Sequence, residues 1–319
     1  MQLHGIHHVT AVSAMIAENV KFYTEVLGLR LVKRSVNQDD VSAYHLFYAD
    51  KAGTPGTDMT FFDWPHIGED LRGTNSISGT AFRVASRAAL DFWANRFDDL
   101  GVQHQGIQAF AGRELLPFED PEGQRLYLVD DQGYAFEGEV WRRDDIPDEY
   151  TLRGFYSVVL SIPSFQQLKP IFSQILNFEE IQRGTWIDGK TDAAIFTTTA
   201  EGGPGTEVWV LKEPDAVRAG LGAGGTHHVA FRVKDIEDQR KWRENIIEGG
   251  LHVSRLIDRF WFNSIYFRVS DGILFEIATD GPGFAIDEDP DELGEKLVLP
   301  PFLENRREQI EAGLTPIEA

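Results

Sequence analysis

The chain has 319 residues, of which 42% are hydrophobic and 25% are charged, so its length predicts two domains rather than one. The net charge of −21 argues against nucleic acid or an anionic membrane surface as a partner. The absence of cysteine excludes disulfides, thiolate metal sites and a cysteine nucleophile. No apolar run reaches about 18 residues and no signal-peptide pattern opens the chain, so we expect a cytoplasmic protein without membrane helices.

The first half of the sequence repeats in the second half at an offset of 149 residues. "TAFRV" at 80–84 matches "VAFRV" at 229–233 at this offset. The same offset aligns "GIHHV" at 5–9 with "GFYSV" at 154–158, and "PGTDM" at 55–59 with "PGTEV" at 204–208. Three independent matches at one offset predict an internal duplication.

Each half divides again into two units. Apolar strands are predicted near His8, Gly79, Ser157 and His228. Each strand is followed by a helix N-cap candidate and apolar residues at helical spacing; the candidates are Ser13, Ser86, Ser164 and Asp235. Two or three alternating runs then complete each unit. The pattern predicts an α+β fold of four βαβββ modules in two tandem halves, in which paired modules enclose a cleft.

We place the domain boundaries by composition. The predicted domains are 1–145 and 151–284, joined by the charged, proline-containing "WRRDDIPDEY" at 141–150. Residues 285–319 form a tail with a short helix in "LENRREQIEAGL". The acidic "DEDPDELGEK" at 287–296 is interpreted as a solvated loop.

Equivalent strand positions differ in which modules supply metal-ligand side chains. The second histidine of each His-His pair, His8 and His228, falls in modules 1 and 4, where modules 2 and 3 have Gly79 and Ser157. On the last strand, module 4 supplies Glu276. The corresponding residues of the other modules are Tyr127, Trp209 and approximately Thr60. Only modules 1 and 4 therefore offer two imidazoles and one carboxylate.

Two histidines and one carboxylate on one face of a metal are typical of non-haem Fe(II) oxygen chemistry, and Mn(II) suits the same set. Glu276 lies in the apolar "ILFEIA", where an ionised carboxylate is costly unless paired or metal-bound. Neighbouring strand residues face opposite ways, so one histidine of each pair can point directly into the cleft. His227 shares its strand face with Val229, Phe231 and Val233, which is the more apolar face. This favours His8 and His228 as the ligands. The alternative is that these are hydrogen-bonded core histidines and a solvent-facing Glu276.

The chain resembles the vicinal oxygen chelate superfamily, whose βαβββ modules pair around a metal cleft. Within it, the chain is most similar to hydroquinone-type ring-cleaving dioxygenases. The resemblance is carried by "LHGIHHVT", "YHLFYADKAGTPGTDMTFFDWP", "GTHHVAFRV", "DRFWFNSIYFRVSDGILFEIATDGPGF" and the tail "DEDPDELGEKLVLPPF". It covers nearly the whole chain.

The resemblance implies Fe(II) held by His8, His228 and Glu276, with a hydroquinone-like or catechol-like diol and O2 as substrates. It also implies that Tyr266 lies near the substrate and that Arg259 stabilises an anionic oxygen, although this sequence is two residues shorter beside Arg259. A further set is expected to line the site: His7, Thr10 and His227. Either His227 or Tyr266 is a candidate base for a phenolic proton.

Several remaining side chains receive simpler interpretations. Aromatic residues are expected as pocket walls: Phe61, Trp261 and Phe262. Histidines without a repeat-equivalent partner are interpreted as structural: His4, His45, His66, His104 and His252.

Two alternative functions fit the same fold. A glyoxalase-type isomerase or lyase usually needs a fourth ligand, often Glu, where module 1 offers Thr60 or Phe61. A metal-free protein that binds small aromatic molecules would have no need of His8, His228 and Glu276 together. The sequence leaves the oligomeric state open, homo-oligomers included.

Overall fold

The computed structural model describes residues 1–317 and confirms four βαβββ modules. Module 1 contains β1 (Ile6–Ser13), α1 (Ile16–Lys21), β2 (Arg30–Asn37), β3 (Asp40–Ala49) and β4 (Asp58–Asp63). Module 2 contains β5 (Ser76–Val84), α2 (Arg87–Leu100), β6 (Gln108–Phe110), β7 (Arg113–Glu119) and β8 (Arg125–Asp130). Module 3 contains β9 (Phe155–Ile162), α3 (Phe165–Pro170), β10 (Glu179–Thr185), β11 (Asp192–Thr197) and β12 (Glu207–Lys212). Module 4 contains β13 (Thr226–Val233), α4 (Ile236–Glu248), β14 (Ile257–Asp258), β15 (Asn263–Arg268) and β16 (Leu274–Thr279).

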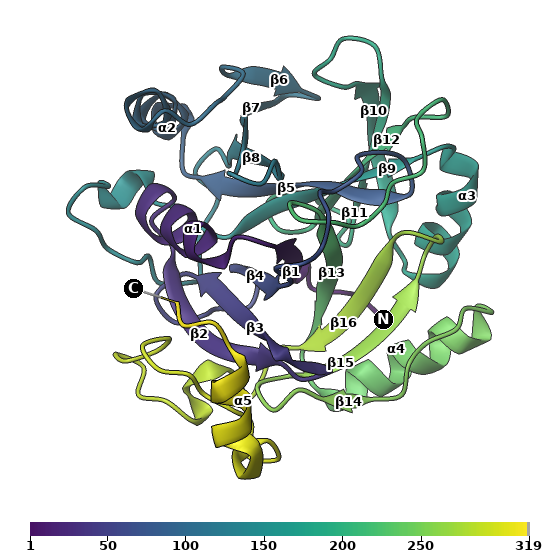
Figure 1. Cartoon of the computed structure of the whole chain (residues 1–319). Coiled ribbons are helices and arrows are strands. Elements are labelled where there is room, and N and C mark those ends of the chain that lie inside the picture. The colour runs from purple at the N-terminus through teal and green to yellow at the C-terminus, as the bar shows by residue number, and fades with distance from the viewer. Residues whose placement is uncertain (318–319) are drawn as a thin grey trace.

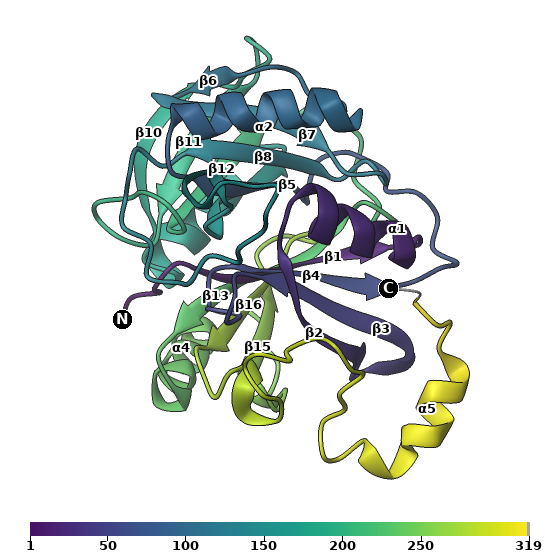
Figure 2. The ribbon, with the colours of Figure 1, turned by 90° about the vertical axis from the view of Figure 1, so that its left-hand side faces the viewer.

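The modules combine into two eight-stranded sheets, each of which takes one module from each half of the sequence (Figure 1). The first sheet has the order β14-β15-β16-β13-β1-β4-β3-β2 and joins modules 4 and 1. The second has the order β10-β11-β12-β9-β5-β8-β7-β6 and joins modules 3 and 2. Figure 2 shows the second sheet above the first, with α2 along its outer side. The first and last modules therefore share one continuous sheet.

Helix starts follow the predicted caps in three of the four modules. The side chains of Ser86, Ser164 and Asp235 accept hydrogen bonds from backbone N–H groups of the first turns of α2, α3 and α4. Ser13 is instead the last residue of β1, and α1 begins at Ile16 after Met15 without a side-chain cap. A π-helical turn follows α1 at Phe22–Val26 and α3 at Ile171–Ile175. None of the helices in residues 1–317 is long and apolar enough to cross a membrane.

A β-bulge interrupts the pairing where each first strand meets its partner module. Between β1 and β13, the register leaves His7 unpaired on one strand and His227 on the other. Between β5 and β9, it leaves Ser78 and Tyr156 unpaired at the equivalent places. Because a bulged residue departs from strict alternation, its side chain is re-aimed relative to a regular strand. The bulges therefore allow the two imidazole rings of each His-His pair to contact each other.

Glycines allow the two halves of the chain to cross. Gly5 has a φ of +94°, and a Cβ there would lie 2.5 Å from the Gly205 carbonyl oxygen. Gly154 has a φ of +86°, and a Cβ there would lie 2.5 Å from the Gly56 carbonyl oxygen. Only glycine fits such a backbone conformation and contact without strain. The repeated "PGT" segments are thus the crossing points of the duplicated halves.

The core is built from the faces of the sheets that the helices cover. This apolar cluster runs through all four modules and includes Phe82, Trp93, Phe172 and Trp242, each 5% exposed or less. The concave face of the second sheet is also filled, mainly by aromatic side chains: Phe110, Tyr127, Tyr156, Trp186 and Trp209. The concave face of the first sheet also carries large rings, such as Trp261 and Phe262, but there the polar residues His8, His228 and Glu276 gather beside them.

The acidic tail is a mostly exposed loop, as predicted, but two of its carboxylates pair with a buried lysine. Lys33 on β2 is fully buried, and its Nζ lies 2.8 Å from Asp287 Oδ1 and also pairs with Glu288. Lys33 also donates to the carbonyl oxygen of Phe284 at 3.1 Å. A buried ammonium requires such partners, so the tail carboxylates compensate it. The predicted short helix is present as α5 (Arg307–Gly313), beside β2 and β3 in Figure 2.

We predict that Lys33→Ala lowers the free energy of unfolding by about 3 kcal/mol, because it leaves buried carboxylates without their cation. Lys296→Ala is the matched control, since Lys296 pairs with Glu292 of the same tail but is 74% exposed. The control should cost less than about 0.5 kcal/mol. Urea denaturation measures both, and equal effects of the two substitutions would contradict the role of Lys33.

Candidate metal centre

His8, His228 and Glu276 come from three neighbouring strands at the centre of the first sheet. His8 on β1 pairs with Ala230 on β13, and Ala230 pairs with Glu276 on β16. His228 pairs with Thr10, two residues along from His8. Side chains two residues apart on a strand share a face, so this register directs all three toward one point.

The three side chains are buried and their ligand atoms converge within 4.8 Å of one another. Glu276 Oε2 lies 3.0 Å from His228 Nε2 and 3.2 Å from His8 Nε2, and the two Nε2 atoms are 3.3 Å apart. Oε2 nevertheless makes no hydrogen bond of good geometry with any residue in 1–317, whereas Oε1 accepts one from Ser264 Oγ at 2.5 Å. Three possible ligand atoms that converge on one point, one of them a buried oxygen without a hydrogen bond, fit a divalent cation.

The charge state of Glu276 suits the same interpretation. Burial alone would raise the pKa of Glu276, but the adjacent His8 and His228 rings hold it well below its usual value. Burial lowers the pKa of His228 below 6.5. The centre therefore combines an ionised carboxylate with a neutral imidazole, the protonation states that metal ligands require.

The first histidine of each pair orients the second. His7 Nδ1 lies 2.9 Å from His8 Nδ1, and His7 Nε2 lies 3.2 Å from the Thr279 carbonyl oxygen. Because a carbonyl only accepts, His7 Nε2 must carry the proton. Burial lowers the pKa of His7 to about 3, so the ring is neutral and its Nδ1 accepts from His8 Nδ1–H. With its proton on Nδ1, a neutral His8 ring would present the lone pair of Nε2 to a metal.

His227 makes the same contact with the other ligand candidate. Its Nδ1 lies 2.8 Å from His228 Nδ1, and burial lowers the pKa of His227 to about 3. The adjacent pairs therefore act as matched units, in which the bulged histidine fixes the ring of its neighbour. Each histidine of the two His-His pairs therefore has a partner within its own pair.

A small cavity of about 30 Å³ opens beside His8 and His228. Arg259 and Tyr266 line it, as expected, and the Tyr266 ring centroid lies 5.6 Å from that of His228. Burial raises the pKa of Tyr266, so its phenol stays protonated at neutral pH and can donate a hydrogen bond. The remaining walls are mostly aromatic: Phe47, Phe62, Trp261 and Phe262.

Phe61 is not a wall of this cavity, contrary to the prediction. Its ring packs on the helix side against Tyr23 and Tyr48, at centroid distances of 4.6 and 5.9 Å. Alternation along β4 explains the difference, because Thr60 and Phe62 face the cavity side and Phe61 faces away.

The turn between β2 and β3 covers the mouth of the cavity. Gln38 Nε2 donates to the Arg259 carbonyl oxygen at 2.9 Å, and Arg259 Nη2 lies 2.7 Å from Asp39 Oδ2. A cavity that holds a benzene-sized ring has a volume on the order of 150 Å³, larger than the space seen here. Gln38 and Asp39 therefore lie with Arg259 in the wall of a cavity that is smaller than an aromatic ring.

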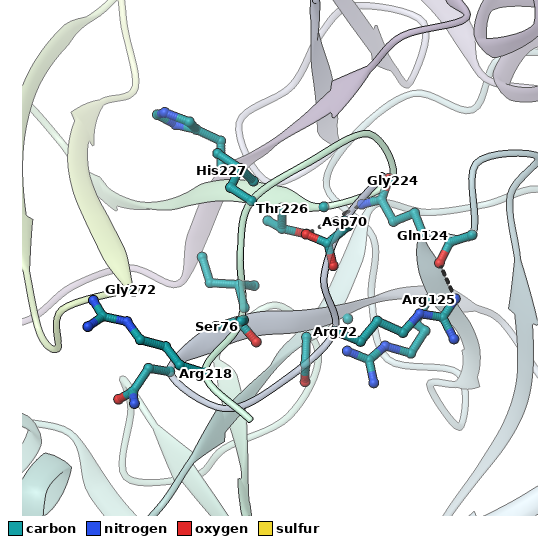
Figure 3. A pocket seen from close by; sticks show the side chains of 18 of the residues that line it. Asp70, Arg72, Ser76, Gln124, Arg125, Arg218, Gly224, Thr226, His227 and Gly272 are labelled. Atoms are coloured by element: carbon teal, nitrogen blue, oxygen red, sulfur yellow. Dashed lines mark hydrogen bonds between the residues drawn. The ribbon is translucent and has the colours of Figure 1, made fainter. Parts of the chain in front are cut away.

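Three of the predicted site residues do not line this cavity. His7, Thr10 and His227 contact the ligand candidates instead of the open space. His227 lies at the edge of a second cavity of about 250 Å³, lined by Arg72, Arg125, Arg218 and Arg268 (Figure 3). This position does not place His227 to take a proton from a molecule in the small cavity.

The sequence interpretation missed His45. We interpreted it as structural because it has no repeat-equivalent partner, but it lines the cavity from β3. Its Nε2 lies 3.0 Å from Thr60 Oγ1. Strand parity offered the one available signal, since His45 and Phe47 alternate toward the same face.

Comparison with known proteins places this geometry in a family. The model of the Glyoxalase/Bleomycin resistance protein/Dioxygenase superfamily matches residues 5–128 and 155–277. A Bacillus subtilis (strain 168) protein named "Putative ring-cleaving dioxygenase MhqA" is 45% identical over 318 residues, covering 100% of both chains. The chlorohydroquinone/hydroquinone 1,2-dioxygenase of Sphingobium indicum is 28% identical and covers 97% of this chain and 95% of its own.

Solved structures agree with this assignment. A Bacillus subtilis crystal structure described as a "putative dioxygenase" superposes with a TM-score of 0.90 at 35% identity, covering 99% of this chain and 98% of its own. Glyoxalase I from Zea mays shares the fold, with a TM-score of 0.62 at 14% identity over 86% of this chain and 92% of its own. The chain therefore belongs to the Glyoxalase/Bleomycin resistance protein/Dioxygenase superfamily.

Proposed function

We propose that this protein is a non-haem Fe(II)-dependent dioxygenase that cleaves the ring of a hydroquinone-like or catechol-like aromatic diol with O2. The observation that carries the proposal is the convergence of His8 Nε2, His228 Nε2 and the unsatisfied Glu276 Oε2 beside an aromatic-walled cavity. The names of the relatives from Bacillus subtilis and Sphingobium indicum support the same reaction class.

His8, His228 and Glu276 would hold the metal, and Mn(II) fits the same ligands. When bound, the ion supplies an electron path between an aromatic diol and dioxygen. Ser264 orients Glu276 through Oε1, so that Oε2 faces the two imidazoles. His7 would hold His8 in the tautomer that leaves Nε2 free, and His227 makes the same contact with the His228 ring. These contacts pre-organise the ligand set before a substrate arrives.

Tyr266 and Arg259 would act on the substrate oxygens. Tyr266 is a proton donor rather than a base, because its phenol remains protonated. Arg259 lies over the Tyr266 ring, with Cζ 5.6 Å from the centroid, and brings a positive charge to the cavity. Phe47, Phe62 and Trp261 would exclude water and stack against an aromatic ring.

Two observations weigh against the competing functions. A glyoxalase-type centre would need a fourth ligand on β4, where Thr60 Oγ1 is occupied by hydrogen bonds to Thr10 and His45. A metal-free binding protein would gain nothing from burying Glu276 Oε2 without a hydrogen bond. The dioxygenase proposal accounts for both.

We predict that His228→Ala and Glu276→Gln abolish retention of Fe(II), because each removes one of three ligands. Metal content after anaerobic Fe(II) loading and desalting measures this. Ser157→Ala is the matched control, since Ser157 occupies the position of His8 in module 3, and it should retain the metal. Wild-type iron content in either ligand variant would contradict the assignment.

We predict that Tyr266→Phe lowers kcat for O2 uptake with hydroquinones or catechols by about 10²-fold, because a positioned proton donor is lost. Tyr127→Phe removes a phenol from the equivalent concave face of the second sheet and should leave the rate unchanged. An oxygen electrode measures both rates. Absence of O2 uptake by the Fe(II)-loaded wild type with every diol tested would refute the proposed reaction.

We predict that His7→Phe weakens metal affinity by about 10- to 100-fold, because His8 loses the acceptor that fixes its tautomer. Competition with a metal chelator measures the affinity. Phe262, whose ring centroid lies 5.3 Å from that of His7, provides an aromatic neighbour for the new side chain. Unchanged affinity in a folded variant would show that the tautomer of His8 is set in another way.

A further inference from the structure

A chain of hydrogen bonds leads from the cavity to the metal-ligand candidates through three neighbouring strands. His45 Nε2 on β3 lies 3.0 Å from Thr60 Oγ1 on β4, and Thr60 donates to Thr10 Oγ1 on β1 at 2.8 Å. Thr10 Oγ1 lies 3.0 Å from His228 Nε2. Both threonines are fully buried, and the His45 ring lies between Phe47 and Phe62 at centroid distances of 4.0 and 4.5 Å.

The chain has a defined polarity. Each hydroxyl carries a single proton, and that of Thr60 is directed at Thr10. Thr60 must therefore accept from His45 Nε2–H. Burial keeps the pKa of His45 well below 6.5, so the ring is neutral and donates through one nitrogen only. The proton of Thr10 is then left for the far end of the chain, beside His228 Nε2.

A metal bound at His228 Nε2 would change which atom can accept the hydrogen bond from Thr10. A bound metal would take the lone pair of Nε2, so Nε2 could not accept the Thr10 proton. Thr10 does not line the open cavity, but its Oγ1 lies 3.0 Å from Nε2, so its hydroxyl would then donate to an oxygen held directly beside Nε2. A phenolic oxygen of a diol is the substrate atom that needs such a donor, since coordination makes it anionic.

The second sheet shows that this place in the fold does not require polar side chains. Val159 pairs with Trp209 there, as Thr10 pairs with Thr60 in the first sheet. Phe47 pairs with Thr60 and Ile195 pairs with Trp209, so His45 corresponds to Ala193. Val159, Trp209 and Ala193 pack in the concave face of the second sheet without a hydrogen bond to one another, and Trp209 Nε1 donates instead to Glu207 Oε2 at 2.7 Å. The polar chain is confined to the sheet that carries the metal-ligand candidates.

We propose that His45 and Thr60 are positioning residues that hold the Thr10 hydroxyl as a hydrogen-bond donor to the phenolic oxygen of an aromatic diol beside His228. This inference rests on the proposed function and adds two residues that act through Thr10. Neither residue needs to touch the reacting atoms.

Paired substitutions test the proposal on the metal-loaded protein without oxygen. Thr60→Val and His45→Phe keep shape but remove the hydrogen-bonding group, whereas Thr60→Ser and His45→Gln retain it. Hydroquinone is the probe, and quenching of the fluorescence of Trp261 and the other tryptophans reports its Kd. We expect Thr60→Val and His45→Phe to weaken binding about tenfold, and Thr60→Ser and His45→Gln to change it less than about threefold.

The double variant Thr60→Val/His45→Phe gives the sharper measurement. Because both residues act through Thr10, the double variant should bind hydroquinone no more weakly than Thr60→Val alone. Metal content and Tm, measured on each variant, should match those of the wild type. If Thr60→Val does not fold, the His45 pair carries the test, since His45 lies at the edge of the cavity.

The failures of the two proposals differ. A wild-type protein that takes up no metal, or binds no hydroquinone when loaded, would overturn the proposed function and this inference together. Wild-type binding that Thr60→Val and His45→Phe leave unchanged would overturn the inference alone. Losses that Thr60→Ser and His45→Gln fail to restore, or that add in the double variant, would show an ordinary packing role and also overturn it.

Discussion

The antiparallel pairing of β1 with β13 is the constraint on which the candidate site depends. It brings His8 beside His228 although 220 residues separate them, and it fixes their distance from Glu276 through the parallel pairing of β13 with β16. The bulges in this pairing are equally necessary, because they bring His7 and His227 against the ligand rings. Backbone hydrogen bonds thus set the ligand geometry, and the paired histidines set the proton positions.

Sequence repeats predicted the modules and the three ligand candidates because the relevant signals are periodic. A fixed offset reveals duplicated strands, and a carboxylate in an apolar strand stands out against its neighbours. Parity on a regular strand also assigned His8 and His228 correctly to a common face. It could not reveal the bulges, since the register between two distant strands depends on both partners.

Other features escaped the sequence because their partners lie far along the chain. The acidic tail has the composition of a solvated loop. Nothing in the local sequence indicates that Asp287 pairs with the buried Lys33, 254 residues away. His45 lacks a repeat-equivalent histidine, so the search for repeated features passed over it. Its contact with Thr60 depends on how β3 pairs with β4. Phe61 was misplaced although parity with Thr60 already indicated the opposite face.

The two sheets show how one architecture divides its tasks after duplication. In the second sheet, Trp186, Trp209 and their neighbours fill the concave face and contribute packing. In the first sheet, polar residues occupy the corresponding face and their burial is costly unless they are satisfied. Aromatic side chains such as Phe47, Trp261 and Phe262 pack beside these polar residues in the first sheet.

The sharing of one sheet by the first and last modules has a consequence for synthesis. While the chain emerges from the ribosome, His8 appears early, but its partners His228 and Glu276 follow only after both central modules have been made. An unfinished polypeptide therefore has no complete ligand set, and oxygen-activating chemistry cannot begin on a nascent chain. The order of the modules therefore delays assembly of the candidate centre until module 4 has been made.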